Sequence, residues 1–419
     1  MKRYEHYSSV SNLLTNEIPS HWKMKRNRAF LRPKFVSVGQ DADKYPLLSL
    51  TTNGIILRDI ESGKGKFPKD FDAYQVVEPN DIVFCLFDVD ETPRTVGLSS
   101  LNGMLTGAYD AFSISHAVNP QYVNYYYTAV DDIKALRPYY TGLRKVVKKD
   151  KFLAISVPLP PIEEQNKIVA YLDKRITLID NCKCQREREL QTLNELKQAE
   201  IASVVTRGLN PNVPMKDSGQ IQFGEIPAHW DSVKMKYCFT QRSEKGFPNE
   251  PVLCATQSKG VIPQSLYENR VVVVNKGFEG LKLVKVGDFV ISLRSFQGGI
   301  EYAYYQGIIS AAYTILTPKD VRNSQYFKYL FKSHPFIQLL QTCVTGIREG
   351  QNINYGVLGN NFIPIPPIEE QNAIVEYIEA KTNKIDTMVE ALKAEIDRLT
   401  EYKQRLISDV VTGQINVQD

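Results

Sequence analysis

The sequence predicts an α+β fold in which two mostly-β globular domains are separated by two long antiparallel coiled-coil helices. Three observations support this prediction. Residues 158–166, PLPPIEEQN, return as residues 364–372, PIPPIEEQN, with eight of nine positions identical at an offset of 206 residues (364 − 158). Residues 17–22, EIPSHW, return as residues 225–230, EIPAHW. A heptad pattern of apolar residues follows each copy of the longer motif, as is typical of a coiled coil.

The duplication includes the globular parts of the chain and gives it internal pseudo-twofold symmetry. Three shorter matches keep their order: residues 81–84 with 288–291, 121–122 with 325–326, and 141–144 with 345–348. A period of 206 residues is too long for a solenoid, whose repeats run about 20–50 residues. The predicted segments are a first globular domain over 1–157, a central helix over 158–207, a connector over 208–220, a second globular domain over 221–363 and a C-terminal helix over 364–419.

Short runs of β-branched and aromatic residues between turn residues predict the strands of each globular domain. The runs lie at 46–52, 81–87 and 109–115 in the first domain and at 271–274, 288–293 and 312–316 in the second. One helix is expected in each domain, over 120–136 and over 324–342. The mixture of strands and helices within each domain indicates the α+β class.

Apolar residues that recur every seven positions define the two long helices. The C-terminal helix has Ile378, Ile385, Leu392, Leu399 and Leu406 in one row, and Val375, Val389, Ile396 and Val410 in another. The central helix has Leu172, Ile179 and Leu193, and Val169, Ile176, Leu190 and Val204. The same stripe contains the polar residues Lys183, Arg186, Lys197 and Glu200. These polar residues either fix the register of the helices or mark the place where the helices diverge. The paired prolines and the two glutamates that follow suit the start of a helix.

The composition permits nucleic acid as a partner without requiring it. The chain has 419 residues, 43% of them apolar, with a net charge of +4 and a pI of about 8.5, so it is mildly basic. Its six cysteines show no zinc-ligand spacing and are expected to be reduced thiols. No apolar run has the length of a signal core or a membrane span, so we expect a soluble cytoplasmic protein.

Sequence motifs for catalysis, cofactor binding and metal binding are missing. Residues 63–66, GKGK, do not fit a phosphate-binding loop. Residues 119–122, NPQY, are close to the N/D-P-P-Y/F motif of amino-methyltransferases, but Gln121 replaces the second proline, and a turn into a helix is the better interpretation. Glu163 and Glu164 are neighbours in a helix, where their side chains point apart, so they do not form an acid–base pair. We therefore expect no catalytic residue and no metal.

A basic segment in the first domain is the leading candidate for nucleic-acid binding. Five basic residues fall within eight positions directly after Thr141 and Gly142: Arg144, Lys145, Lys148, Lys149 and Lys151. The segment is either a solvated loop or a DNA-facing loop whose cations neutralise phosphates. The second domain repeats the pattern with Thr345 and Arg348. Arginine suits guanine and phosphate equally well, so both kinds of contact stay open.

Further basic residues lie in corresponding turns of the two domains. Arg94 and Arg294 precede glycines after a strand, and they either contact DNA or form surface salt bridges. Lys64 and Lys66, in a glycine-rich loop, and Lys259, before Gly260, are candidate phosphate contacts. Trp22 and Trp230 are interpreted as core residues. They occupy the same place in both copies, whereas contacts to two different targets should differ.

Two domains that each begin with E-I-P-x-H-W and each lead into P-x-P-P-I-E-E-Q and a long helix resemble the specificity subunit of type I restriction–modification enzymes. The resemblance covers nearly the whole chain, and residues 216–219, KDSG, are also similar to the family's central region. Residues 7–10, YSSV, depart from the corresponding N-terminal pattern.

The resemblance implies that each globular domain is a target-recognition domain for one half of a split sequence in double-stranded DNA. The helices would fix the distance between the half-sites. Two modification (methyltransferase) subunits would dock on the chain, and restriction (nuclease and translocase) subunits would join them. S-adenosylmethionine and ATP would belong to those partners. This chain would then hold no cofactor and would not itself be an enzyme. Apart from the resemblance, the lack of a long apolar run leads us to expect no membrane partner.

Two other interpretations of the residues remain open. The chain is alternatively a coiled-coil scaffold with ligand-binding heads, or a self-sufficient restriction enzyme or methyltransferase. The enzyme would need motifs that the sequence lacks. In this chain the helices and the domain starts repeat closely, whereas most of the other globular sequence does not. A scaffold has little need of globular domains that differ in this way.

Overall fold

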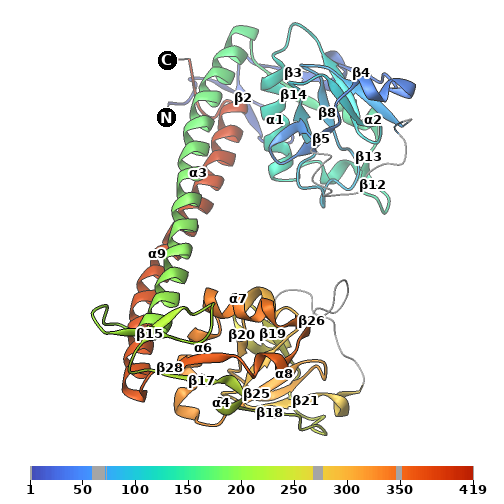
Figure 1. Ribbon diagram of the computed structural model, residues 1–419. Coiled ribbons are helices and arrows are strands. Elements are labelled where there is room, and N and C mark those ends of the chain that lie inside the picture. The colour runs from blue at the N-terminus through green and yellow to red at the C-terminus, as the bar shows by residue number, and fades with distance from the viewer. Residues whose placement is uncertain (1, 59–70, 72, 268–276, 346–351, 419) are drawn as a thin grey trace. The chain divides into compact units, whose positions relative to one another are not determined.

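The chain folds into two compact units, shown in the computed structural model in Figure 1. The structure describes residues 2–58, 71, 73–267, 277–345 and 352–418. Unit 1 comprises residues 1–186 and 394–419, and unit 2 comprises residues 187–393. Each unit therefore contains one globular domain and parts of both long helices. Across the described ranges, no helix combines the length and apolar character needed to cross a membrane.

Unit 1 is built around a four-stranded antiparallel sheet in the order β4-β11-β8-β9. These strands are β4 (Leu31–Lys34), β11 (Asp110–Ile114), β8 (Ile82–Phe84) and β9 (Val96–Leu98). Five strand pairs surround the sheet: β1 (Tyr7–Ser9) with β2 (Glu17–Pro19), β3 (Lys23–Arg26) with β14 (Ser156–Leu159), β5 (Leu48–Thr51) with β6 (Gly54–Leu57), β7 (Tyr74–Val77) with β10 (Gly103–Thr106), and β12 (Tyr140–Thr141) with β13 (Val146–Val147). Helices α1 (Pro120–Asp132) and α2 (Lys149–Ala154) complete the domain. Its core includes the buried rings of Phe84, Phe112, Tyr127 and Phe152.

Unit 2 repeats this pairing strand for strand. Its four-stranded sheet has the order β18 (Phe239–Arg242), β25 (Thr314–Pro318), β22 (Phe289–Ile291) and β23 (Glu301–Tyr302). The pairs are β15 (Met215–Asp217) with β16 (Glu225–Pro227), β17 (Asp231–Lys234) with β28 (Phe362–Ile365), β19 (Leu253–Thr256) with β20 (Gly260–Pro263), β21 (Lys282–Val284) with β24 (Gly307–Ile309), and β26 (Val344–Thr345) with β27 (Asn352–Ile353). Its short helices are α4 (Met235–Cys238), α5 (Ser295–Gly298), α6 (Ser324–Leu330), α7 (His334–Thr342) and α8 (Tyr355–Leu358). The predicted α+β duplication is confirmed.

Most of the predicted strands correspond to observed ones, and one helix prediction was wrong. The runs at 46–52, 81–87, 109–115 and 288–293 contain β5, β8, β11 and β22, and the run at 312–316 overlaps β25. The run at 271–274 lies outside the described residues. The helix expected over 324–342 is two helices, α6 and α7, because Pro335 cannot sit in a helix interior. The chain turns to extended backbone at Ser333 and starts α7 with the proline in its first turn.

The predicted long helices are α3 (Ile162–Arg207) and α9 (Ile368–Val411). In unit 1 Lys403 pairs with Asp180 at 2.7 Å and Glu395 with Arg186 at 3.0 Å, so the helices run antiparallel there (Figure 1). In unit 2 Lys197 pairs with Asp386 at 2.6 Å, and Glu200 accepts a hydrogen bond from the hydroxyl of Tyr377. Three of the polar stripe residues thus make contacts between the helices, which favours a role in fixing the register.

The two repeated motifs meet in each unit through a glutamate. In unit 1 the buried Glu164 accepts hydrogen bonds from Trp22 Nε1 at 3.1 Å and from the Tyr4 hydroxyl at 2.5 Å, and its Oε2 lies 2.8 Å from His21 Nε2. In unit 2 Glu370 Oε2 lies 2.9 Å from Trp230 Nε1 and 2.7 Å from His229 Nε2. Trp22 and Trp230 are 5% and 0% exposed, which confirms that they are core residues.

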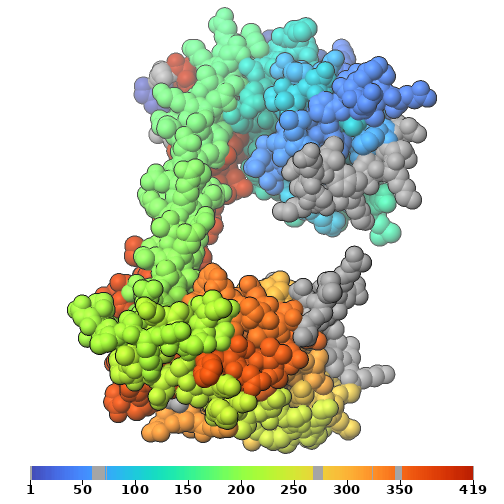
Figure 2. Space-filling model, viewed as in Figure 1, coloured from blue at the N-terminus to red at the C-terminus, as the bar shows by residue number. Residues whose placement is uncertain are grey.

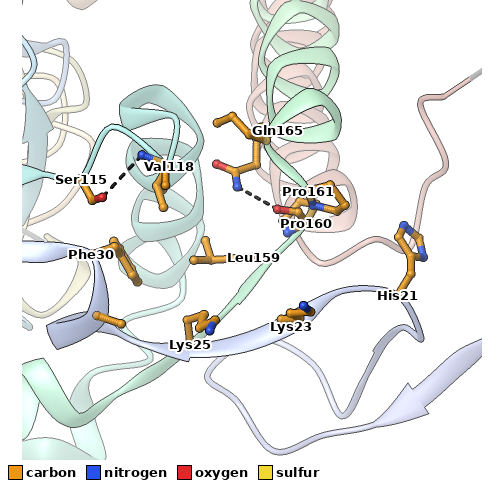
Figure 3. Close-up of a pocket in the computed structure, with 13 residues that line it drawn as sticks. His21, Lys23, Lys25, Phe30, Ser115, Val118, Leu159, Pro160, Pro161 and Gln165 are labelled. Carbon is orange, nitrogen blue, oxygen red and sulfur yellow. Dashed lines mark hydrogen bonds between the residues drawn. The ribbon is translucent and has the colours of Figure 1, made fainter.

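The start of α3 is held by side chains that both copies share. Gln165 Nε2 donates to the Pro160 carbonyl at 2.8 Å, beside a cavity of about 430 Å³ that His21, Lys23 and Lys25 help to line (Figure 3). Gln371 and Pro366 repeat this bond in unit 2, also at 2.8 Å. The repeated sequence therefore connects each globular domain to a long helix.

The repeated tyrosine of α1 and α6 makes a second connection. In unit 1 the Tyr122 hydroxyl donates to the carbonyls of Pro158 and Val411, and in unit 2 the Tyr326 hydroxyl does the same with Pro364 and Val205. Each tyrosine thus ties its domain to the end of a long helix. The NPQY segment is a turn into a helix, as predicted, because Asn119 caps α1 by accepting from the backbone N–H groups of Gln121 and Tyr122.

Candidate nucleic-acid interface

The predicted basic segment of unit 1 forms a β-hairpin. Strands β12 and β13 pair Tyr140 with Val147 and Thr141 with Val146, and a tight turn joins them. The turn has positive φ angles at Gly142 (76°) and Lys145 (46°). The sequence predicted only a loop here, although Val146 and Val147 are β-branched residues after a glycine turn and so give a weak hairpin signal. The hairpin's part of the chain, turquoise in Figure 2, lies at the surface of unit 1.

The base of the turn is fixed to the loop that follows β8. The Asp88 N–H donates to the Arg144 carbonyl at 2.8 Å, and the Val147 N–H donates to the Leu86 carbonyl at 2.8 Å. Lys145 Nζ pairs with Glu91 at 2.6 Å and with Asp90 at 3.4 Å. The hydrogen bond to Glu91 raises the pKa of Lys145. Lys145 therefore stabilises the turn from within.

The remaining cations of the segment face solvent. Arg144, Lys148 and Lys151 are exposed and have no ion-pair partner among the described residues. Lys149 pairs with Asp110 at 2.6 Å, yet its side chain is 49% exposed. Thr141 is exposed beside them at the end of β12. The structure thus places Thr141 and Arg144 on one exposed hairpin, with Lys148 directly after its second strand.

Unit 2 has the same hairpin base. Strands β26 and β27 pair Val344 with Ile353 and Thr345 with Asn352, in the register of β12 and β13. Thr345 is the last residue of β26. Arg348, the other candidate residue predicted in this repeat, lies outside the described residues. The repeated T-G-x-R sequence therefore follows an equivalent strand in both units.

The other candidate residues have different surroundings. The Arg94 side chain is 19% exposed and pairs with Asp131 at 3.1 Å and with Asp132 at 2.9 Å. Of the two roles that the sequence left open for Arg94, these contacts favour a salt bridge over a DNA contact. Arg294 precedes α5 and is exposed. Lys259 is exposed in the β19–β20 turn. The last two candidates, Lys64 and Lys66, fall outside the residues that the structure describes.

Beside Lys259 lies a cavity of about 640 Å³, for which the sequence contains no motif. Tyr302, Tyr304 and Lys328 line it, together with Glu301, which is only 2% exposed. Lys332 Nζ pairs with Glu301 Oε1 at 2.5 Å. In unit 2 Glu301 pairs with Val290 of β22, and at the equivalent place in unit 1 Gly97 pairs with Val83 of β8. The Glu301 carboxyl in the cavity therefore distinguishes the two domains.

We expect Glu301 to make unit 2 less stable as the pH rises. Burial raises its pKa to about 7, and the Lys332 ammonium only partly offsets this. The folded state therefore holds a proton that the unfolded state loses near pH 4.5, so the free energy of unfolding falls between about pH 4.5 and 7. Glu301→Gln should remove about 3 kcal/mol of this pH dependence, as measured by denaturant unfolding at several pH values. Glu279→Gln, at an exposed position of the same unit, should leave it unchanged, and equal pH curves for wild type and Glu301→Gln would contradict the assignment.

Comparisons with known proteins agree with the duplicated architecture. A family model described as the type I restriction modification DNA specificity domain matches residues 107–192 and 227–398. The putative type I restriction enzyme MjaX specificity subunit of Methanocaldococcus jannaschii is 26% identical over 277 residues, which are 63% of this chain and 60% of that protein. The MjaVIII specificity subunit of the same organism is 28% identical over 296 residues, 67% of this chain and 66% of that protein. The matches thus span less than two thirds of either relative's length.

The fold is also found in a solved structure. A chain from a structure concerning complex assembly and conformational transition of the type I R-M system has a TM-score of 0.67, with 16% identity, and the match covers 95% of this chain and 99% of that chain. At that identity the match concerns the fold alone, whereas the family model covers more than half of the chain in two separate segments. The chain belongs to the type I restriction–modification DNA specificity family.

Proposed function

We propose that this chain is the DNA sequence-specificity subunit of a type I restriction–modification complex. It recognises a bipartite target in double-stranded DNA, with one half-site for each globular domain. The observation that supports this most is the duplicated fold. Both units repeat the same strand pairing and the same Glu–Trp–His contacts, but they differ at other positions, such as Gly97 and Glu301. Such a chain holds two different recognition surfaces on one common framework.

The proposal assigns catalysis to partner proteins. Two modification subunits dock on the chain and restriction subunits join them, and these partners hold S-adenosylmethionine and ATP. The assembled complex acts in the cytoplasm, where the DNA is. The relatives named as specificity subunits of type I restriction enzymes support this assignment over a coiled-coil scaffold with ligand-binding heads.

A mobility-shift assay with the assembled complex tests the proposal. Binding to duplex DNA should weaken steeply between about 50 and 200 mM salt, because exposed cations such as Arg144 displace counterions from phosphates. An affinity for DNA that does not change with salt concentration, or no binding at any salt concentration, would refute the proposal.

Lengthening both long helices should change the distance between half-sites. Arg186 of α3 faces Glu395 of α9, so one heptad inserted at each of these positions keeps the helices paired. Seven residues add about 10 Å of helix, or about three base pairs of duplex DNA. Binding-site selection should return unchanged half-sites with a longer gap.

The control for this experiment is the same seven residues inserted after Asn210. Asn210 lies in the exposed segment between α3 and β15, outside both long helices. This variant should keep the original gap. Altered half-sites with the original gap in the helix variant would contradict the proposed role of the helices.

A further inference from the structure

One repeated sequence differs from the others in its surroundings. Trp22, Glu164 and Tyr122 belong to repeated motifs and are buried, where they connect the globular domain to the helices. The repeat T-G-L-R of residues 141–144, which returns as T-G-I-R at 345–348, is exposed at all four positions in unit 1. Leu143 is fully exposed, and the Arg144 side chain is exposed and forms no ion pair with any residue that the structure describes. A structural role does not explain why this sequence occurs twice.

The apolar residue of this repeat stands at the tip of the hairpin. Leu143 is 103% exposed, more than any other large apolar residue that the structure describes. The turn beneath it is fixed by the bond from Asp88 to the Arg144 carbonyl and by the Lys145–Glu91 ion pair. Leu143 is therefore an apolar side chain held out into water on a rigid support, which lowers the entropy cost of placing it in a binding site.

The side chains around the hairpin tip are positively charged, as is typical of a surface that binds a polyanion. Arg144, Lys148 and Lys151 are exposed, and within the described part of the chain no carboxylate pairs with them. An apolar side chain flanked by cations suits DNA, because the cations bind phosphates while the apolar group enters the base stack. Leucine and isoleucine are among the residues that proteins insert between base steps.

We propose that Leu143 inserts between base pairs of bound duplex DNA beside the half-site of unit 1, with Arg144 on an adjacent phosphate. This inference rests on the proposed function and adds a task that is the same at both half-sites. Residues that recognise different sequences should differ between the domains, whereas a residue that opens the base stack is useful at either. Modification of a base inside a duplex requires the base to leave the stack, and a wedge that unstacks its neighbours eases that step.

The test uses the assembled complex without S-adenosylmethionine and a duplex obtained by binding-site selection. Each adenine in and around the first half-site is replaced in turn by 2-aminopurine, whose fluorescence rises when it is unstacked. Wild type should give an increase at one base step beside the half-site. Leu143→Ala should reduce that increase at least threefold and weaken binding about tenfold, and Leu143→Phe should preserve it. Arg144→Ala should lower the salt dependence of binding and retain the fluorescence increase.

Ile133→Ala serves as the matched control, since Ile133 is also exposed (63%) and follows α1, outside the hairpin strands and their turn. It should change neither signal. Unchanged fluorescence and affinity in Leu143→Ala would overturn the inference while the proposed function stands. Failure of Leu143→Ala to assemble with the partner subunits would also overturn it, because the tip would then bind a protein partner. If the wild-type complex bound no duplex DNA, that result would contradict the proposed function itself.

Discussion

Replacing Glu164 by alanine is expected to destabilise unit 1 by about 2–4 kcal/mol, whereas Glu163→Ala should change its stability by less than about 0.5 kcal/mol. Glu164 is buried and accepts hydrogen bonds from Trp22 and Tyr4, with His21 also in contact. Its removal leaves the buried Trp22 N–H and the partly buried Tyr4 hydroxyl without this acceptor, and such unpaired groups are costly. Glu163, its neighbour in α3, is exposed and contributes only charge near the helix start.

The two tryptophans allow this comparison to be made for one unit at a time. Trp22 belongs to unit 1 and Trp230 to unit 2, and the chain has no other tryptophan. In a Trp230→Phe background, fluorescence of Trp22 therefore follows unfolding of unit 1 in denaturant. Equal midpoints for Glu164→Ala and Glu163→Ala would contradict the role assigned to Glu164. Glu370→Ala should have a smaller effect in unit 2, because the Glu370 side chain is 25% exposed, against 6% for Glu164.

The same variant should alter how unit 1 responds to acid. Burial opposes ionisation of Glu164, but the hydrogen bonds from Tyr4, His21 and Trp22 outweigh it and lower the pKa of the carboxyl. A lowered pKa in the folded state gives stability that is present above the unfolded pKa and is lost as the pH falls through the folded one. Glu164→Ala should remove this part of the acid sensitivity, and Glu163→Ala should keep it.

Replacing both Arg144 and Arg348 by alanine is expected to give the largest loss of DNA binding. If both arginines contact phosphates, the slope of log affinity against log salt should fall by about two, with affinity reduced uniformly for all sequences. If either contacts a base, affinity for the selected site should fall by about ten- to a hundredfold and specificity should relax at one position. Salt titration and binding-site selection on the two single variants separate these cases.

Arg322→Ala provides the control for the arginine variants. The Arg322 side chain is 72% exposed and pairs with Asp320 at 2.7 Å, so this variant removes a surface arginine that already has an acidic partner. It should leave the salt slope and the selected sequence unchanged. The same affinity and specificity in the Arg144→Ala, Arg348→Ala double variant as in wild type would remove the hairpin from the proposed interface.

The sequence was informative wherever a pattern has one physical cause. Heptads such as Ile378 and Ile385 predicted α9, and both are almost fully buried. The repeat of Trp22 as Trp230 predicted two core residues. These predictions succeeded because periodic burial and internal duplication are visible in a single chain.

The site residues were less predictable because charge alone does not show which partner a side chain meets. For Arg94 the sequence left a DNA contact and a surface salt bridge equally open, and the structure shows that Arg94 contacts Asp131 and Asp132, residues far from it in the sequence. Glu164 was interpreted as a charge at a helix start, because nothing local shows that Trp22 reaches it. The partners in each case are set by the tertiary fold.

Binding-site selection with the assembled wild-type complex tests the central claim most directly. Random duplexes should yield two different conserved half-sites separated by a gap of fixed length and free sequence, because two unlike domains are carried by one duplicated framework. A single continuous site, or recovery of duplexes without any shared sequence, would contradict the claim that each domain recognises one half of a bipartite target.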